Sequence, residues 1–228
     1  MKDHECPVKV PADKMTLDGD LCIPSSARGL VVFSHGSGSS RHSPRNRYVA
    51  GELRQAGLAT LLIDLLTPDE EADDAFSGNW RFDINLLSRR LTGITDWIHT
   101  AKDTRHLNPG LFGASTGAAA ALITAALREK VVKAVVSRGG RPDLALPLLD
   151  QVKAPTLLIV GGKDIPVIKM NREALVRIKT EKRLVIVPGA THLFEEPGAL
   201  EQVADLAREW FIRYLTAKNK TKDTEIVR

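Results

Sequence analysis

The chain has 228 residues, of which 43% are hydrophobic and 26% are charged. A composition of this kind is ordinary for one soluble domain with a sizeable core. The net charge of +4 comes from acidic and basic residues interleaved along the chain, so nothing in it indicates nucleic-acid binding. No segment approaches the roughly 18 apolar residues of a membrane span, and the N-terminal residues lack the apolar region of a signal peptide. We therefore expect a cytoplasmic protein with no nucleic-acid or membrane partner.

The predicted elements begin with a β-hairpin, because short alternating runs flank the turn-forming pair Asp18-Gly19. Further along, compact runs that are apolar on both faces indicate buried parallel strands. These runs cover residues 29–36, 57–65, 108–115, 131–138, 154–162 and 183–189. Helical patterns lie between and after them, at residues 48–55, 84–100, 116–128, 167–179 and 200–215. The alternation predicts an α/β fold with a mostly parallel, doubly wound sheet and an N-terminal antiparallel hairpin.

One domain accounts for residues 1–217, and residues 218–228 have the polar composition of a C-terminal tail. Two connections are long, at residues 66–83 and 137–155, but each holds only about 18 residues. Neither is long enough to fold over the sheet as a large lid. We therefore expect ligands to have open access to the carboxyl edge of the sheet, where the loops after parallel strands meet.

Ser115 lies between Gly113 and Gly117 in the pattern G-x-S-x-G, where an apolar run gives way to an alanine-rich helix. A sharp strand-to-helix turn strains the backbone of its central serine, and small residues two positions away avoid clashes. This context favours a nucleophilic serine over the alternative, an ordinary serine at a helix N-terminus.

A serine hydroxyl needs a base to remove its proton, and in this type of fold the order along the chain is serine, acid, histidine. His192, directly after the last apolar run, is the only histidine downstream of Ser115. Asp164 is the only downstream acid that closes a strand through a glycine turn, so it is the candidate that orients the imidazole. Two alternatives stay open, with Asp164 as the cap of the following helix and His192 as a residue that fills a loop.

The negatively charged oxygen of an acyl-transfer intermediate needs backbone donors beside the nucleophile. The N–H of Thr116 is the first candidate, and the N–H of Ser37 in the glycine-rich run SHGSG is the second. A dinucleotide-binding loop is the alternative for this run, which lacks the third glycine of that motif. His35 in the same run is expected to pack and hydrogen-bond rather than act as a second base. Metal-ligand spacings such as H-E-x-x-H do not occur, so we expect no metal or cofactor.

Four motifs, SHGSGSS, GASTG, VGGKD and GATHLF, occur in this order and resemble those of the α/β-hydrolase superfamily. The short chain without a large cap is similar to the dienelactone hydrolase-like branch, over about residues 8 to 215. Enzymes that give that branch its name use a cysteine at the position that Ser115 occupies. The resemblance implies a serine hydrolase that cleaves short-chain carboxylic esters or lactones through an acyl-enzyme. An acyltransferase with the same triad and a catalytically silent binding module of the same fold stay open.

Several arginines lie in loops at the same edge of the sheet and indicate a substrate that carries a carboxylate. Arg138 is the main candidate, because two glycines beside it would let a ligand approach, and Arg81 and Arg41 are further candidates. The alternative is that these arginines are solvated or pair with acidic neighbours such as Asp74 and Asp143. The expected partner is a small ester or lactone, and the oligomeric state stays open.

Overall fold

The computed structural model describes residues 5–216. One sheet of eight strands runs through it in the order β1-β2-β4-β3-β5-β6-β7-β8. The strands are β1 (Cys6–Ala12), β2 (Met15–Cys22), β3 (Gly29–Ser34), β4 (Ala59–Ile63), β5 (Asn108–Ala114), β6 (Ala134–Arg138), β7 (Thr156–Gly161) and β8 (Lys182–Val187). β3 through β8 pair in parallel, whereas β2 is antiparallel to both β1 and β4. This confirms the predicted sheet, and the predicted tail at 218–228 lies outside the described residues.

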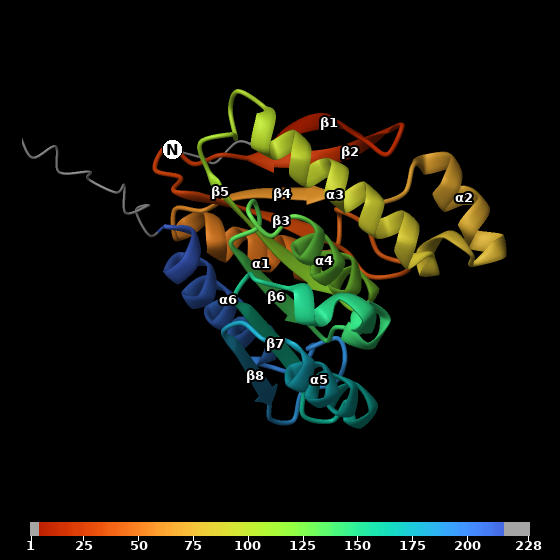
Figure 1. The fold of residues 1–228 in the computed structure, drawn as a ribbon, viewed down its shortest axis with the longest axis vertical. Coiled ribbons are helices and arrows are strands. Elements are labelled where there is room, and N and C mark those ends of the chain that lie inside the picture. Colours follow the sequence, from red (N-terminus) through yellow and green to blue (C-terminus); the bar gives the residue numbers. More distant parts are fainter. Residues whose placement is uncertain (1–4, 217–228) are drawn as a thin grey trace, which may run out of the picture.

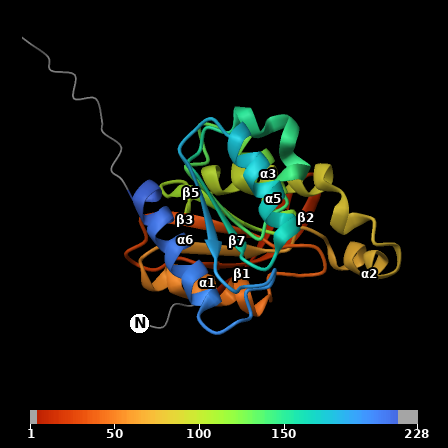
Figure 2. The same ribbon diagram turned by 90° about the horizontal axis from the view of Figure 1, so that it is seen from below.

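Helices cover both faces of the sheet (Figure 1). The α-helices are α1 (Pro44–Gln55), α2 (Pro68–Ser77), α3 (Ile84–Thr100), α4 (Thr116–Leu127), α5 (Ile165–Arg177) and α6 (Ala199–Leu215), and the 3-10 segments are η1 (Trp80–Phe82) and η2 (Pro142–Gln151). α1 and α6 lie on one face, and α3, α4 and α5 lie on the other (Figure 2). Each face therefore has its own buried apolar core. No helix among residues 5–216 is long and apolar enough to cross a membrane.

The turn of the N-terminal hairpin lies at Asp13-Lys14, so the prediction of a turn at Asp18-Gly19 was wrong. Asp13 and Lys14 have φ values of 44° and 68°. Two central residues with positive φ make the type I′ turn that suits a twisted hairpin. Gly19 lies inside β2 instead, where an added Cβ would stand 3.0 Å from Leu61 Cδ1. This glycine therefore marks close packing between strands rather than a turn.

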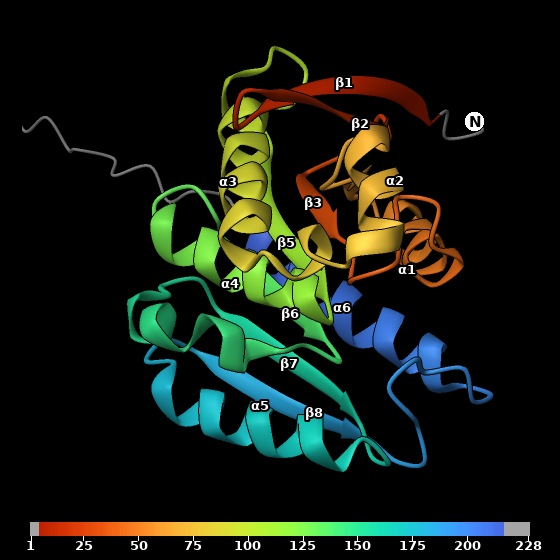
Figure 3. The ribbon, with the colours of Figure 1, turned by 90° about the vertical axis from the view of Figure 1, so that its right-hand side faces the viewer.

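The connection at residues 66–83 is more than a loop, because it contains α2 and η1. α2 stands out from the body of the molecule (Figure 1), and it lies far from α5 (Figure 3). Its first turn is a capping box, in which the Thr67 hydroxyl accepts from the Glu70 N–H and the Glu70 carboxylate accepts from the Thr67 N–H. Glu70 also pairs with Arg90 of α3 at 2.6 Å, which ties the start of α2 to the core.

Candidate active site

Ser115 lies between β5 and α4 with φ 50° and ψ −119°, a strained backbone conformation for a residue with a side chain. Close packing around this turn explains the two glycines of the motif. A Cβ on Gly113 would lie 2.4 Å from Ala118 Cα, and a Cβ on Gly117 would lie 2.3 Å from the Ser34 carbonyl oxygen. Both distances are too short for non-bonded atoms, so the turn needs glycine at both positions.

Asp164 and His192 come together from the loops after β7 and β8. Oδ2 of Asp164 lies 2.6 Å from Nδ1 of His192. With the ring proton assigned to Nδ1, the Nε2 lone pair is available to accept a proton. Asp164 directly precedes α5, but no hydrogen bond from its side chain caps that helix in the described part of the chain. The geometry therefore favours an acid that orients the histidine over a helix cap.

The loop after β6 links the serine to the histidine. The Ser115 N–H donates to the Arg138 carbonyl at 3.1 Å, and the Arg141 N–H donates to the Ser115 carbonyl at 3.1 Å. Between these two arginines, a Cβ on Gly139 would lie 3.4 Å from His192 Nδ1. Within residues 5–216, no hydrogen bond joins the Ser115 hydroxyl to His192, a contact that in many enzymes forms only with substrate bound. The three predicted triad residues thus share one edge of the sheet.

Asn171 of α5 is a residue at this site that sequence reasoning missed. Its buried side-chain amide donates to the Gly140 carbonyl at 3.0 Å and to the Val167 carbonyl at 2.8 Å. Asn171 therefore fixes the loop after β6 from the side of α5. No sequence signal distinguished it, because an asparagine within a helix usually faces solvent.

The two predicted oxyanion donors lie side by side, but one of them already has an acceptor. The Ser37 N–H donates to Thr116 Oγ1 at 2.9 Å. The loop that carries Ser37 packs against the nucleophile turn, since a Cβ on Gly36 would lie 3.1 Å from Ser115 Cβ. An oxyanion here would share the Ser37 N–H with the Thr116 hydroxyl or displace that hydroxyl. The role of Ser37 therefore stays a prediction.

His35 is confirmed as a packing and hydrogen-bonding residue. Its Nδ1 donates to the Gly36 carbonyl at 3.0 Å, and its Nε2 accepts the Leu65 N–H at 3.1 Å. Burial lowers the pKa of His35, which favours the neutral ring that this pattern of donor and acceptor requires. The ring thus fastens the loop after β3 to the end of β4.

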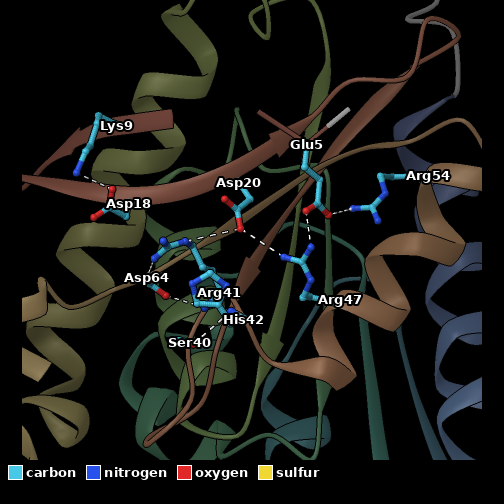
Figure 4. A network of polar contacts seen from close by, with 10 residues as sticks. All are labelled: Glu5, Lys9, Asp18, Asp20, Ser40, Arg41, His42, Arg47, Arg54 and Asp64. Carbon is cyan, nitrogen blue, oxygen red and sulfur yellow. Dashed lines mark hydrogen bonds and ion pairs between the residues drawn. The ribbon is translucent and has the colours of Figure 1, made fainter. Parts of the chain in front are cut away.

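Two of the three predicted substrate-binding arginines are paired with acidic residues. Arg41 lies between Asp64 and Asp20 (Figure 4), with its backbone N–H 2.6 Å from Asp64 Oδ1 and its guanidinium on Asp64 Oδ2. Burial alone would lower the pKa of Arg41, but the Asp64 carboxylate raises it. Arg81 pairs with Asp74, whose backbone carbonyl lies 2.6 Å from Arg81 Nη2. The acid-pairing alternative thus describes both arginines.

Arg138 differs from the other two. It is 8% exposed, and its side chain makes no hydrogen bond or ion pair with any residue from 5 to 216. Its guanidinium lies 5.9 Å from the centre of the Phe194 ring. Burial and the nearby positive charge of Arg45 lower its pKa to about 10. Arg45, rather than the other candidates Arg81 and Arg41, is therefore the arginine whose charge acts on Arg138.

A cavity of about 300 Å³ opens beside the loop after β3. Its lining consists of residues 35–40, Leu66, Glu71, Asp74, Arg81 and Leu87. This volume suits a small ligand, and the cavity adjoins the Ser115 turn through Gly36. Within the described range, no three His, Cys, Asp or Glu side chains gather where they could hold a metal ion.

The comparison with protein families identifies the family of the chain. The model of the dienelactone hydrolase family matches residues 17–217. The chain belongs to the dienelactone hydrolase family. A crystal structure of dienelactone hydrolase from Anabaena variabilis is similar, with a TM-score of 0.93 and 61% identity over 94% of this chain and all of that one. Membership of this family confirms the resemblance seen in the motifs and supports hydrolase activity.

Two further similarities are less direct. Est1E from Butyrivibrio proteoclasticus shares the fold of this dienelactone hydrolase-family chain, with a TM-score of 0.76 at 16% identity over 91% of this chain and 98% of Est1E. A Mycobacterium tuberculosis protein named "Putative phosphoribosyl transferase" is 57% identical over 215 residues. These residues make up 94% of this chain but 47% of the relative, so this chain spans about half of that protein. The activity in the name is therefore that of a longer protein.

Proposed function

We propose that this member of the dienelactone hydrolase family is a serine hydrolase that cleaves short-chain carboxylic esters or lactones through an acyl-enzyme. The observation that carries the proposal is the 2.6 Å contact between Asp164 and His192 at the edge of the sheet where the strained turn holds Ser115. A serine at a strained turn, with a histidine at the same edge of the sheet and an acid bound to that histidine, is the general arrangement for nucleophilic acyl transfer.

In the proposed reaction, the Ser115 hydroxyl oxygen attacks the carbonyl carbon of the substrate while His192 Nε2 takes the hydroxyl proton. Asp164 keeps the imidazole in its orientation and stabilises the charged ring. The same proton then passes to the leaving oxygen as the ester C–O bond breaks, and the acyl group stays on Ser115. Water then attacks the acyl carbon while His192 Nε2 takes a proton from it. The bond between the acyl carbon and Ser115 Oγ breaks, His192 returns the proton to that oxygen, and the acid is released. The Thr116 N–H, with Ser37 as the second donor, would stabilise the oxyanion in both steps.

The volume of the cavity and the short length of α2 both support a preference for small substrates. A space of about 300 Å³ holds a short acyl or alcohol group, and α2 has only 10 residues with which to cover it. We expect a preference for acyl chains of roughly two to six carbons and no activation at lipid interfaces.

A second candidate is acyl transfer to an alcohol or amine in place of water, because the same three residues form the acyl-enzyme in both reactions. Product analysis with and without an added alcohol separates the two. The phosphoribosyl transfer in the name of the mycobacterial relative belongs to a protein about twice as long. The arrangement of Ser115, Asp164 and His192 supports hydrolysis for this chain.

The test is hydrolysis of 4-nitrophenyl esters of increasing acyl length by the purified chain and by Ser115→Ala. We expect the unaltered chain to hydrolyse the acetate and butyrate esters and to turn over longer esters more slowly. Ser115→Ala should lower the rate by several orders of magnitude. Turnover by Ser115→Ala close to that of the unaltered chain would refute the proposal. A rate that rises toward long-chain esters would refute the substrate size.

A further inference from the structure

Among residues 5–216, Arg138 is the arginine near the candidate site whose side chain lacks an acidic partner. Arg41 pairs with Asp64, Arg81 with Asp74 and Arg141 with Asp143. By contrast, Arg138 is 8% exposed, and its Nε is buried without an acceptor among the described residues. A buried charge without a counter-charge lowers the stability of the folded state, so its presence points to a group that the chain itself does not supply.

The side chain of Arg138 points toward α1. Side chains alternate along a strand, and Ala134 and Val136 of β6 belong to the core on the α1/α6 face. Arg138 therefore faces the same side of the sheet. Arg45 lies in the first turn of α1 on that side, and its positive charge lowers the pKa of Arg138. Phe194, with φ 57°, turns its buried ring inward beside the guanidinium.

Arg45 adds a second positive charge that is only partly compensated. Its Nη1 lies 2.9 Å from Glu195 Oε1, but the Glu195 side chain is 61% exposed, so water screens this pair strongly. The Nε of Arg45 is also buried without an acceptor among the described residues. The two guanidinium groups of Arg138 and Arg45 and the one exposed carboxylate of Glu195 leave a net positive charge between β6 and the start of α1.

We propose that Arg138 and Arg45 form a binding site for an oxyanion, a carboxylate or a phosphate group, beside the loop that carries His192. Guanidinium groups bind such planar or tetrahedral oxyanions through paired N–H donors, and burial strengthens the interaction. One bound negative charge would balance the local excess. This site is distinct from the paired arginines Arg41 and Arg81.

The site adjoins the candidate triad. The Arg138 carbonyl accepts the Ser115 N–H, and Gly139, the next residue, packs against His192. The oxyanion therefore has two possible sources, a charged group of the ester substrate or a free anion that binds beside the reaction. The first source rests on the proposed hydrolase function, whereas anion binding itself does not.

The binding test is titration calorimetry with inorganic phosphate on the full chain and on charge-removing variants. Arg138→Met and Arg45→Met should each weaken binding at least about tenfold, because each removes a charge-assisted hydrogen-bond donor. Arg141→Met is the matched control, since it removes a paired arginine from the loop that follows Arg138. The affinity of this variant for phosphate should match that of the unaltered chain. Glu195→Gln should tighten binding, because it removes the competing carboxylate.

The kinetic test compares 4-nitrophenyl butyrate with the mono-4-nitrophenyl ester of glutaric acid, which carries a carboxylate. If the oxyanion belongs to the substrate, Arg138→Met and Arg45→Met raise KM at least about tenfold for the charged ester only, and phosphate competes with it. If the oxyanion is free, phosphate changes kcat for the neutral ester, and both variants abolish that response.

Arg45→Met keeps the test valid should Arg138→Met fold poorly, because Arg45 is partly exposed at the start of a helix. Arg138→Lys offers a second safeguard, since it keeps the charge and should retain part of the binding. The proposal is overturned if neither phosphate affinity nor KM for the charged ester changes in the two methionine variants. It is equally overturned if Arg141→Met weakens binding as much as they do. Because phosphate binding is measured without turnover, an inactive chain would refute the proposed function but leave this test intact.

Discussion

The turn that holds Ser115 and the arginines beside it lie at the same edge of the sheet, yet different kinds of contact define them. The turn is held by backbone atoms close in sequence or on the neighbouring strand, which leave no room for a Cβ at Gly113 or Gly117. The arginines are defined by partners distributed along the chain, such as Asp64 for Arg41. A steric requirement leaves a pattern of small residues in the sequence, whereas the presence of a counter-charge does not.

The same comparison separates the arginines into two groups. Arg41 and Arg81 neutralise buried carboxylates and stabilise the loops that surround the cavity. Arg138 neutralises nothing in the described part of the chain. We therefore expect arginines that look alike in the sequence to make opposite contributions to the free energy of unfolding.

The largest expected effect concerns the histidine beside the turn. His192→Ala should lower kcat by about 10⁴-fold or more, because it removes the proposed base, and Asp164→Asn should cost as much or less. The measurement is steady-state hydrolysis of 4-nitrophenyl butyrate. His106→Ala is the control, since His106 is exposed just before β5, at its amino end. Equal losses in His106→Ala and His192→Ala would contradict the assigned roles.

The next effect concerns the sterics of the turn. Gly117→Ala should lower the free energy of unfolding by about 3 kcal/mol or prevent folding, because its Cβ would overlap the Ser34 carbonyl oxygen. Gly51→Ala in α1 is the control, since the nearest atom to its added Cβ is a flexible Arg54 nitrogen at 3.8 Å. That control should be neutral or more stable by up to about 1 kcal/mol. Urea unfolding of both variants checks the contrast, which disappears if Gly117→Ala is also neutral.

A smaller effect should separate the two groups of arginines. Arg41→Met should lower the free energy of unfolding by about 2–3 kcal/mol, because it leaves the buried Asp64 carboxylate unpaired. Adding Asp64→Asn should restore part of that loss. Arg138→Met should change stability by less than about 1 kcal/mol or increase it, because it removes an unpaired buried charge. Similar losses in both single variants, measured by urea unfolding, would show that Arg138 has a stabilising partner after all.

The smallest expected effect is the dependence of stability on pH at Asp74. Burial would raise the pKa of Asp74, but the backbone N–H and the guanidinium of Arg81 outweigh it and lower the pKa. A carboxyl with a depressed pKa stabilises the fold above its unfolded pKa of about 3.9, and this contribution is lost as the pH falls through the lower folded value.

The measurement for Asp74 is the free energy of unfolding in urea between pH 7 and pH 3. Asp74→Asn should be less stable than the unaltered chain at pH 7, and the gap should narrow toward pH 3. Asp103→Asn, at an exposed carboxylate, should follow the unaltered chain throughout. A gap that stays constant with pH would contradict the assigned ion pair.

Sequence reasoning predicted the parallel sheet, the Ser115 turn and the approach of Asp164 to His192, because each of these follows from hydrophobic period, strand order or local sterics. It placed the start of α1 four residues too late, since Ser43 and Pro44 begin that helix within a polar, arginine-rich run. It missed α2 because the helix is mostly acidic and exposed, and the capping box at Thr67 was the signal that could have found it. The pairing of Arg45 with Glu195 joins residues 150 positions apart, which only the folded chain brings together.

The central claim, that Ser115 is the nucleophile of a hydrolase, is tested most directly by covalent labelling. A fluorophosphonate probe reacts with a serine only when a base and an oxyanion site activate it. Peptide mapping by mass spectrometry should find one adduct, on Ser115, and labelling should disappear in Ser115→Ala and slow greatly in His192→Ala. An adduct on another residue, or an unaltered chain that hydrolyses esters without any label on Ser115, would contradict the account.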